Sequence, residues 1–165
     1  MRLLSKSKLL SFRQCPKKLW LEIHHPELAV TLTATEARYA VGNAVGEVAR
    51  RLYDPKDAGE LIDVDRMGHE AAFWRSRQLL ESAQPIFEAG FSTDGALAFA
   101  DVMLPVDSNG SLGWRMVEVK SATGVKEYYR NDAAIQAFVA RRAGVRLHEK
   151  GGKRHQMPCN HNLEA

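Results

Sequence analysis

The sequence predicts a single α/β domain in which a central mixed β-sheet is flanked by helices. The first observation behind this prediction is the order of the local patterns, which runs helix, helix, strand, strand, strand, helix. The second is the length, since 165 residues are enough for one domain with a substantial core. The third is the composition, because a hydrophobic share of 45% and a charged share of 26% are typical of globular chains.

Capping residues and helix breakers divide the N-terminal third of the chain. Ser5 or Ser7 is predicted to cap a short helix that ends near Pro16, and a second helical turn follows before Pro26. Thr33 or Thr35 is predicted to open a long helix that runs through about Leu52. Its buried stripe is expected to contain Ala37, Val41, Ala44 or Val45, Val48 and Leu52.

The rest of the chain predicts shorter elements and a tail. In chain order we expect a loop over 54–59, a short strand over 61–64, a helix over 68–83, a strand over 86–91, and a last helix capped by Asn131 or Asp132 that runs to Gly144. The segment 148–165 is polar and shows neither the helical nor the strand periodicity of apolar residues. This predicts a poorly ordered tail after a domain over 1–147.

Two strand-like runs, over 97–104 and 114–120, each carry an acid, and a turn-rich linker joins them. A hairpin in suitable register would bring Asp101 near Glu118. Because side chains alternate along a strand, Glu118 and Lys120 should point to the same side. Two carboxylates and an ammonium at one point would suit a divalent metal ion and a phosphate.

The net charge of +3 is unevenly distributed. Residues 1–21 contain six basic side chains and no acid, and residues 141–154 contain six basic side chains and one acid. Basic ends around an acidic centre are typical of a nucleic-acid enzyme, in which cations bind phosphates and carboxylates bind metal. Two solvated basic segments are an equally good explanation of the charge pattern alone.

Several classes of protein do not fit the sequence. No apolar run approaches the roughly 20 residues that cross a bilayer, and no long apolar stretch follows the basic start. The two cysteines, Cys15 and Cys159, do not make a disulfide framework. The expected location is therefore the cytoplasm, with no membrane partner.

The ordered combination of these residues resembles the PD-(D/E)XK nuclease superfamily, in its RecB-like and CRISPR-associated exonuclease branch. A hairpin bearing Asp101 and Glu118-Val119-Lys120, followed by a helix bearing Gln136, resembles the core of that superfamily. The segment 5–22, with its Cys-Pro-Lys-Lys, is similar to the N-terminal motif of the branch. The resemblance covers roughly residues 5–145 and implies a restriction-endonuclease-like fold.

The resemblance also implies a role for each matching residue. Asp101 and Glu118 would be metal ligands, together with the main-chain carbonyl of Val119. Lys120 would orient the attacking water or stabilise the charge of the transition state. Gln136 would steady the site or contact the DNA backbone.

Two positions depart from the pattern of the branch. Gly42 is followed four residues later by Gly46, where a histidine is often found. The adjacent Glu47 is then the candidate for a third metal ligand, and Glu88 is an alternative. Ala140 stands where an aromatic residue often follows the glutamine.

Many members of the branch bind an iron–sulfur cluster through four cysteines. Cys15 is the only cysteine that matches the motif, so a cluster is not expected from this chain alone. Cys159 with His155 and His161 is an alternative site, for zinc.

The sequence thus predicts a metal-dependent DNA nuclease that uses Mg²⁺ or Mn²⁺, exonuclease-like and acting in repair or defence. Lys17 and Lys18 would contact DNA phosphates, and Tyr128, Tyr129 and Trp114 would stack on unpaired bases of single strands or ends. Two alternatives remain open. One is a nucleic-acid-binding module with weak catalysis, and the other is a truncated nuclease fragment that a partner chain completes, which includes a homo-oligomer.

Overall fold

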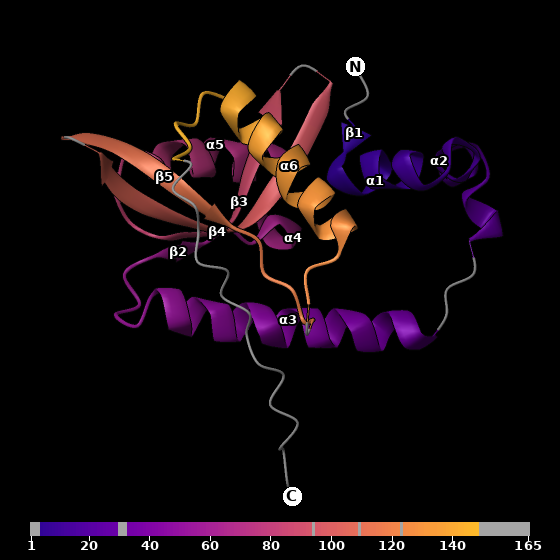
Figure 1. Ribbon diagram of the computed structural model, residues 1–165, viewed down its shortest axis with the longest axis horizontal. Coiled ribbons are helices and arrows are strands. Elements are labelled where there is room, and N and C mark those ends of the chain that lie inside the picture. Colours follow the sequence, from indigo (N-terminus) through magenta and orange to yellow (C-terminus); the bar gives the residue numbers. More distant parts are fainter. Residues whose placement is uncertain (1–3, 30–32, 94, 109, 123, 149–165) are drawn as a thin grey trace, which may run out of the picture.

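The structure is a computed structural model that describes residues 4–29, 33–93, 95–108, 110–122 and 124–148. It confirms the predicted α/β class: a curled, mixed sheet packs against helices (Figure 1). The elements are β1 (Leu4–Ser5), α1 (Lys6–Gln14), α2 (Pro16–His24), a 3₁₀ turn (Pro26–Leu28), α3 (Thr33–Tyr53), β2 (Glu60–Leu61), α4 (Val64–Met67), α5 (His69–Leu79), β3 (Ile86–Thr93), β4 (Ala96–Ser108), β5 (Ser111–Val117) and α6 (Glu127–Arg142).

The long strand β4 organises the sheet. It pairs with β3 along one side in antiparallel register, and β2 extends the sheet beyond β3 in parallel. On its other side, β4 pairs first with β1, in parallel, and then with β5, in antiparallel register. The ladder with β5 ends at the pair Val102–Val117. The sheet is therefore open beside the middle of β4, between β1 and the end of β5.

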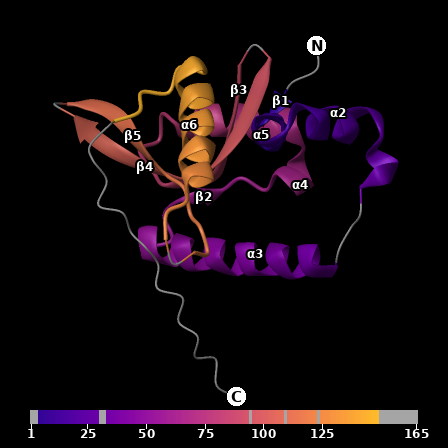
Figure 2. The ribbon, with the colours of Figure 1, turned by 45° about the vertical axis from the view of Figure 1, so that its right-hand side comes forward.

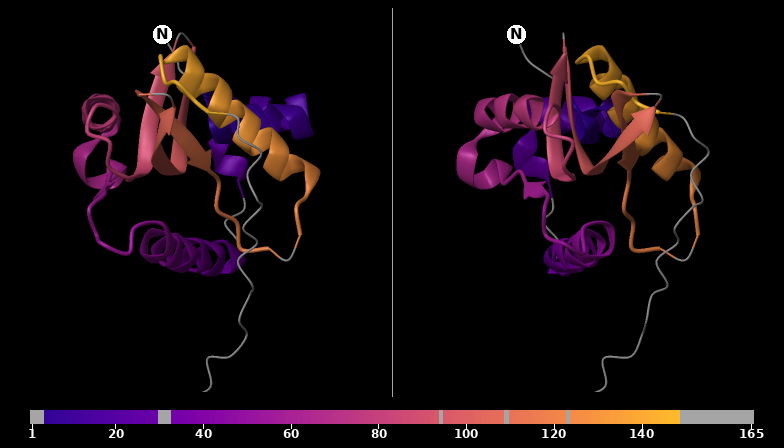
Figure 3. Two further views of the ribbon diagram at one scale, coloured as in Figure 1. Left: turned by 60° about the vertical axis from the view of Figure 1, so that its left-hand side comes forward. Right: turned by 90° about the vertical axis from the view of Figure 1, so that its left-hand side faces the viewer.

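Helices cover both faces of this sheet. Helix α5 lies on one face and α6 on the other (Figure 3), and side chains from both enter the main core. This core contains Ile62, Ala72, Leu79, Ile86, Ala89, Phe91, Ala98, Ala100, Met103, Trp114, Val139, Ala140 and Val145. Helix α1 packs against α6 and β4, so the N-terminal segment lies next to the open part of the sheet.

Helix α3 lies below the sheet, and the segment that joins β5 to α6 reaches toward it (Figure 2). A second apolar cluster of Ala49, Phe87, Val102 and Leu104 connects α3 to the sheet. The predicted stripe is wrong in part, because Val48 and Leu52 are more than half exposed while Ala49 is buried. Among the side chains described in α3, over 42–53, Ala49 and Tyr53 pack in or against this cluster, so this part of the helix buries a narrow face.

The hairpin between β4 and β5 is longer and its turn is tighter than the sequence predicts. The two strands continue to Ser108 and Ser111, so Pro105 lies inside the ladder instead of ending it. Gly110 supplies the positive φ of 79° that the turn needs. Its N–H donates to Oδ1 of Asp107 over 2.9 Å. Strand β5 ends at Val117, so 118–120 lies outside the ladder, which corrects the predicted strand over 114–120.

Other boundaries also differ from the prediction. The second helical turn is a complete helix of nine residues, α2. The predicted strand over 61–64 is only Glu60–Leu61, because Asp63 instead caps α4 by accepting a hydrogen bond from the Arg66 N–H over 3.0 Å. Helix α5 ends at Leu79, and α6 begins at Glu127, several residues before the predicted cap.

The segment after α6 returns to the sheet. Leu147 pairs in parallel with Trp114, and the N–H of His148 donates to the Trp114 carbonyl over 2.9 Å. A Cβ at Gly113 would lie 2.1 Å from the His148 ring, so this contact needs a glycine. His148, predicted to begin the tail, is thus attached to the sheet. The rest of the tail, with Cys159, His155 and His161, lies outside the described residues.

Candidate active site

The candidate site forms where the β4–β5 ladder ends. Beyond the last pair, the N–H of Val119 donates to Oδ2 of Asp101 over 2.7 Å. In a longer ladder this N–H would bind a main-chain carbonyl of β4, but here it binds the side-chain carboxylate of Asp101. This hydrogen bond brings Asp101 beside Glu118. This confirms the predicted proximity of the two acids, although the segment that carries Glu118 is no longer a strand.

The predicted alternation of side chains also holds in this segment. Val119 packs against the second apolar cluster, on the side of α3. Glu118 and Lys120 point away from that cluster, and the Lys120 Nζ forms an ion pair with Oε1 of Glu118. The side chain of Glu118 is 7% exposed, so this carboxylate is held among protein groups instead of water.

Glu88 lies opposite Asp101 on the neighbouring strand β3. The register places Phe87 against Val102 and Ala89 against Ala100, with Glu88 between them. Its φ of 56° is in the left-handed region, which costs a non-glycine residue of the order of 1 kcal/mol or more. Glu88, proposed from the sequence as an alternative third carboxylate, therefore lies at the site, and β3 is distorted at this position.

Two residues that the sequence analysis did not select complete the cluster. Asp132, on α6, accepts from Lys120 over 2.9 Å and from Lys6, the first residue of α1, over 3.0 Å. Lys6 also lies 3.6 Å from Oε1 of Glu118. The four side chains Lys6, Glu118, Lys120 and Asp132 form a closed ring of alternating charge, which we call the charge ring.

Gln136 joins the charge ring from the same helix face as Asp132. Its Nε2 donates to Oε2 of Glu118 over 2.6 Å, and the side chain is fully buried. Its Oε1 is also buried and accepts no hydrogen bond from the described residues. The structure thus brings Gln136 to Glu118, and the unpaired oxygen is an acceptor available to a cation or water.

Burial and mutual repulsion raise the proton affinity of the three acids around the strand ends. Burial, followed by the charge of Asp101, raises the pKa of Glu118 to about 7, although Lys6 and Lys120 oppose this rise. Burial also raises the pKa of Asp101, against the hydrogen bond from Val119. The pKa of Glu88 is raised by burial too. A positive charge added between these carboxylates would relieve the repulsion.

Two members of the charge ring, Lys120 and Asp132, have pKa values shifted in the direction that favours the charged form of each group. Burial works to lower the pKa of Lys120, but the carboxylates of Glu118 and Asp132 outweigh it and raise that pKa above its usual value. Burial works to raise the pKa of Asp132, but Lys120 and Lys6 lower it overall. Lys120 therefore stays protonated at neutral pH and can act only as a cation and hydrogen-bond donor, not as a base.

The pKa of Glu118 predicts how stability changes with pH when no divalent cation is present. The folded carboxyl binds its proton more tightly than the unfolded one, whose pKa is 4.5. The free energy of unfolding should therefore fall as the pH rises from about 4.5 to about 7, by about 3 kcal/mol. Urea unfolding in EDTA at several pH values measures it, and Glu118→Gln should flatten the curve. A wild-type curve that rises over this range would contradict the assignment.

Glu47 is not brought into this site. It is paired with its neighbours on α3, with Oε1 3.0 Å from Arg51 and Oε2 3.8 Å from Arg50. It lines a separate hollow with Leu61 and Phe87. The prediction that Glu47 is a metal ligand therefore has no support in the geometry, whereas Glu88 lies where a third carboxylate was expected.

The predicted DNA contacts are distributed over three elements. Lys17 and Lys18 are exposed on α2, and Lys18 is 2.7 Å from Oε1 of Gln14. Tyr128 and Tyr129 begin α6 with their rings edge to face, and the Lys120 Nζ is 6.0 Å from the Tyr129 ring centre. Both tyrosines are thus next to the site.

The prediction for Trp114 is wrong. Trp114 is 3% exposed in the main core, so it cannot stack on bases. The thiol of Cys15, which lies between α1 and α2, is exposed and forms no disulfide within the described residues. An exposed aromatic side chain is instead present on α2, where Trp20 is 51% exposed.

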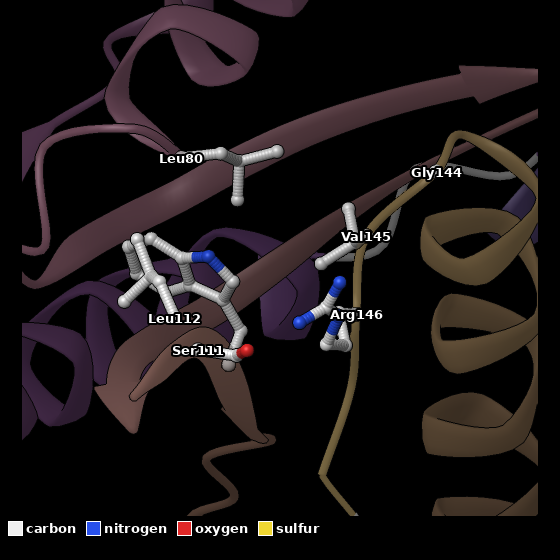
Figure 4. A pocket seen from close by; sticks show the side chains of 7 residues that line it. Leu80, Ser111, Leu112, Gly144, Val145 and Arg146 are labelled. Atoms are coloured by element: carbon white, nitrogen blue, oxygen red, sulfur yellow. The ribbon is translucent and has the colours of Figure 1, made fainter. Parts of the chain in front are cut away.

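A cavity of about 410 Å³ lies elsewhere, between the β4–β5 hairpin and the end of α6. Figure 4 shows Leu80 and Leu112 facing it, with Val145 and Arg146 on the opposite side. No carboxylate of the described residues lines it, and none of its lining residues belongs to the candidate site. None of the helices in the described part of the chain has the length and apolarity that a bilayer crossing requires.

Asp101 and Glu118 are the residues that could hold a metal ion. Within the described ranges, no three His, Cys, Asp or Glu side chains are arranged to hold one ion between them. Mg²⁺ sites of enzymes commonly use one or two carboxylates and complete their coordination with water and substrate phosphates. The donor set, two buried carboxylates beside the free Oε1 of Gln136, fits that pattern.

The balance of charges at the site also suits a divalent cation such as Mg²⁺. Among the described residues, the site combines the four carboxylates of Glu88, Asp101, Glu118 and Asp132 with the two ammonium groups of Lys6 and Lys120. Two negative charges are left over when all six groups are ionised. One divalent cation would neutralise them.

Comparisons of the chain with protein-family models, with curated proteins and with solved structures found no match.

Proposed function

We propose that this protein is a metal-dependent phosphodiesterase that cleaves DNA. The observation that carries the proposal is the convergence of Asp101, Glu118 and Lys120 at the end of the β4–β5 ladder, where the acids repel each other. A structural ion pair would need only equal numbers of acids and bases. The excess of buried carboxylates instead suits a site that binds Mg²⁺ or Mn²⁺.

Each residue would have a definite task. Asp101 and Glu118 would hold the ion, which when bound makes water nucleophilic and neutralises charge on the phosphate. Lys120, protonated at neutral pH, would donate to a phosphate oxygen as negative charge develops there. Asp132 holds the Lys120 ammonium in place, and Gln136 fixes the orientation of the Glu118 carboxylate.

DNA is the substrate that the surroundings of the site support best. Lys17 and Lys18 are exposed on α2 and offer positive charge to the phosphate backbone. Helix α2 packs against α1, whose residue Lys6 reaches the site, so this charge lies on the segment next to the site. Tyr128 is half exposed at the start of α6 and offers a ring on which an unpaired base can stack. Exonuclease-like action on single strands or ends, and membership of the PD-(D/E)XK superfamily, remain parts of this proposal.

The test is cleavage of end-labelled single- and double-stranded DNA with Mg²⁺, with Mn²⁺ and with EDTA. We expect cleavage only with a divalent cation. Asp101→Asn should lower the rate by at least about a thousandfold, because it removes a charged ligand worth several kcal/mol in the transition state. The matched control is Asp65→Asn, an exposed acid on α4, which should leave the rate unchanged. Cleavage that persists in EDTA would reject the proposal.

One observation favours a second candidate, a nucleic-acid-binding module with little or no catalysis. The charge ring satisfies Glu118 with two lysines in the absence of a metal ion. A protein of this kind would bind DNA equally well with EDTA and with Mg²⁺, and would leave DNA intact under both conditions. The same assay, combined with a binding measurement, separates the two candidates.

A further inference from the structure

Lys6 is in an unusual position for the first residue of a surface helix. Its side chain is 25% exposed and extends from α1 into the site, where it meets two carboxylates that are each 7% exposed. It also acts at longer range, because its charge lowers the pKa of Glu88 and Asp101 as well. Lys6 is thus a cation shared by every acid of the site.

The two ion pairs of Lys6 are unequal. Its Nζ is 3.0 Å from Oδ1 of Asp132 but 3.6 Å from Oε1 of Glu118. Asp132 lies on α6 and is not among the proposed metal ligands, whereas Glu118 is. A metal ion that binds Glu118 would therefore compete with the longer contact and leave the shorter one intact.

Electrostatics makes this competition strong. Two cations that share one buried carboxylate repel each other, and the repulsion is larger at a buried site than in water. Lys120 is also attached to Glu118, so a metal ion would be the third cation on this carboxylate. The contact of Lys6 with Glu118 is the longest of the ring and hence the one most easily given up.

We propose that Lys6 is the counter-ion of Glu118 when no metal ion is bound. Lys6 releases Glu118 to an incoming divalent cation and keeps its ion pair with Asp132. This inference rests on the proposed function. It makes metal binding weaker than the carboxylates alone would give, and it couples the start of α1 to metal occupancy. Lys6 is here a positioning residue, because it acts on the metal through Glu118.

The experiment is Mn²⁺ binding by isothermal titration calorimetry, without nucleic acid, for the full chain and for Lys6→Met. Removing the competing cation should make Mn²⁺ bind at least about threefold more tightly. The matched control is Lys8→Met, an exposed lysine two residues along the same helix, whose Mn²⁺ affinity should equal that of the wild type. An affinity of Lys6→Met that is equal to or weaker than the wild type overturns the inference.

A second measurement on the wild-type chain needs no variant and so does not depend on whether Lys6→Met folds. The side-chain signals of Lys6 in the NMR spectrum should shift during a Mg²⁺ titration, and those of Lys8 should not. A static Lys6 signal overturns the inference.

The outcomes separate this inference from the proposed function. Unchanged Mn²⁺ affinity in Lys6→Met together with normal DNA cleavage overturns the inference alone. Mn²⁺ binding by Lys6→Met but not by the wild type supports the inference even if the wild type does not cleave DNA. No Mn²⁺ binding by either protein overturns the inference, and the DNA-cleavage assay then decides the proposed function separately.

Discussion

Glu118→Gln is expected to abolish metal-dependent DNA cleavage while leaving the protein folded. The substitution keeps the size of the side chain but removes the charge that would hold the cation. It also removes the partner that Lys6 and Lys120 share. The loss should be roughly a thousandfold or more, since a bound cation contributes several kcal/mol to the stabilisation of the transition state. Initial rates on labelled DNA with Mg²⁺ measure it.

The control for this variant is its stability. Because folding raises the pKa of Glu118 to about 7, ionising this carboxyl costs more free energy in the folded protein than in the unfolded chain. A neutral glutamine should therefore be at least as stable as the wild type at pH 8 in EDTA. Glu70→Gln, at an exposed position of α5, provides the matched surface substitution. A folded Glu118→Gln protein that cleaves DNA normally would rule Glu118 out as a ligand.

Lys120→Met should lower the rate of cleavage by about 10²- to 10³-fold, the loss expected when one preorganised donor to a developing oxyanion is removed. Methionine retains the length and most of the apolar stem of the side chain. The Mn²⁺ affinity of this variant should not fall, because Lys120 competes with the metal for Glu118 and does not bind it. Single-turnover cleavage rates at saturating Mn²⁺ separate this loss from any change in metal binding.

Lys56→Met, in the exposed turn after α3, is the matched control for Lys120→Met and should cleave DNA at the wild-type rate. The pH profile gives a further check. Since Lys120 remains protonated across the neutral range, its loss should reduce the rate by the same factor from pH 6 to pH 9. A loss confined to high pH would mean that Lys120 accepts a proton.

The relation between Asp101 and Glu118 could be predicted from the sequence because hairpin pairing and strand alternation are short-range rules. The turn is shorter than the turn-rich linker suggests, because Pro105 pairs with Trp114 within the ladder. The end of β5 could not be foreseen, since it depends on Asp101 accepting the Val119 N–H that another strand residue would have bound.

Asp132 and Lys6, the two members of the charge ring that the sequence analysis did not select, differ in how predictable they were. Asp132 lies four residues before Gln136, so both are on one face of α6, and that spacing was a usable signal. Predicting the helix to begin at Asn131 or Asp132 made this aspartate a cap and hid its role. Lys6 had no local signal, because only the packing of α1 against α6 brings it to the acids.

The left-handed backbone at Glu88 has a consequence for how faithfully the sheet assembles. A slip of β3 by one residue against β4 would move this conformation away from Asp101 and turn alternate side chains to the wrong face. A residue with irregular backbone inside a strand fits one register of the two strands and disfavours the others. Glu88 thus adds negative charge to the site and also favours one register of β3 against β4, so a single residue contributes to both the fold and the charge of the site.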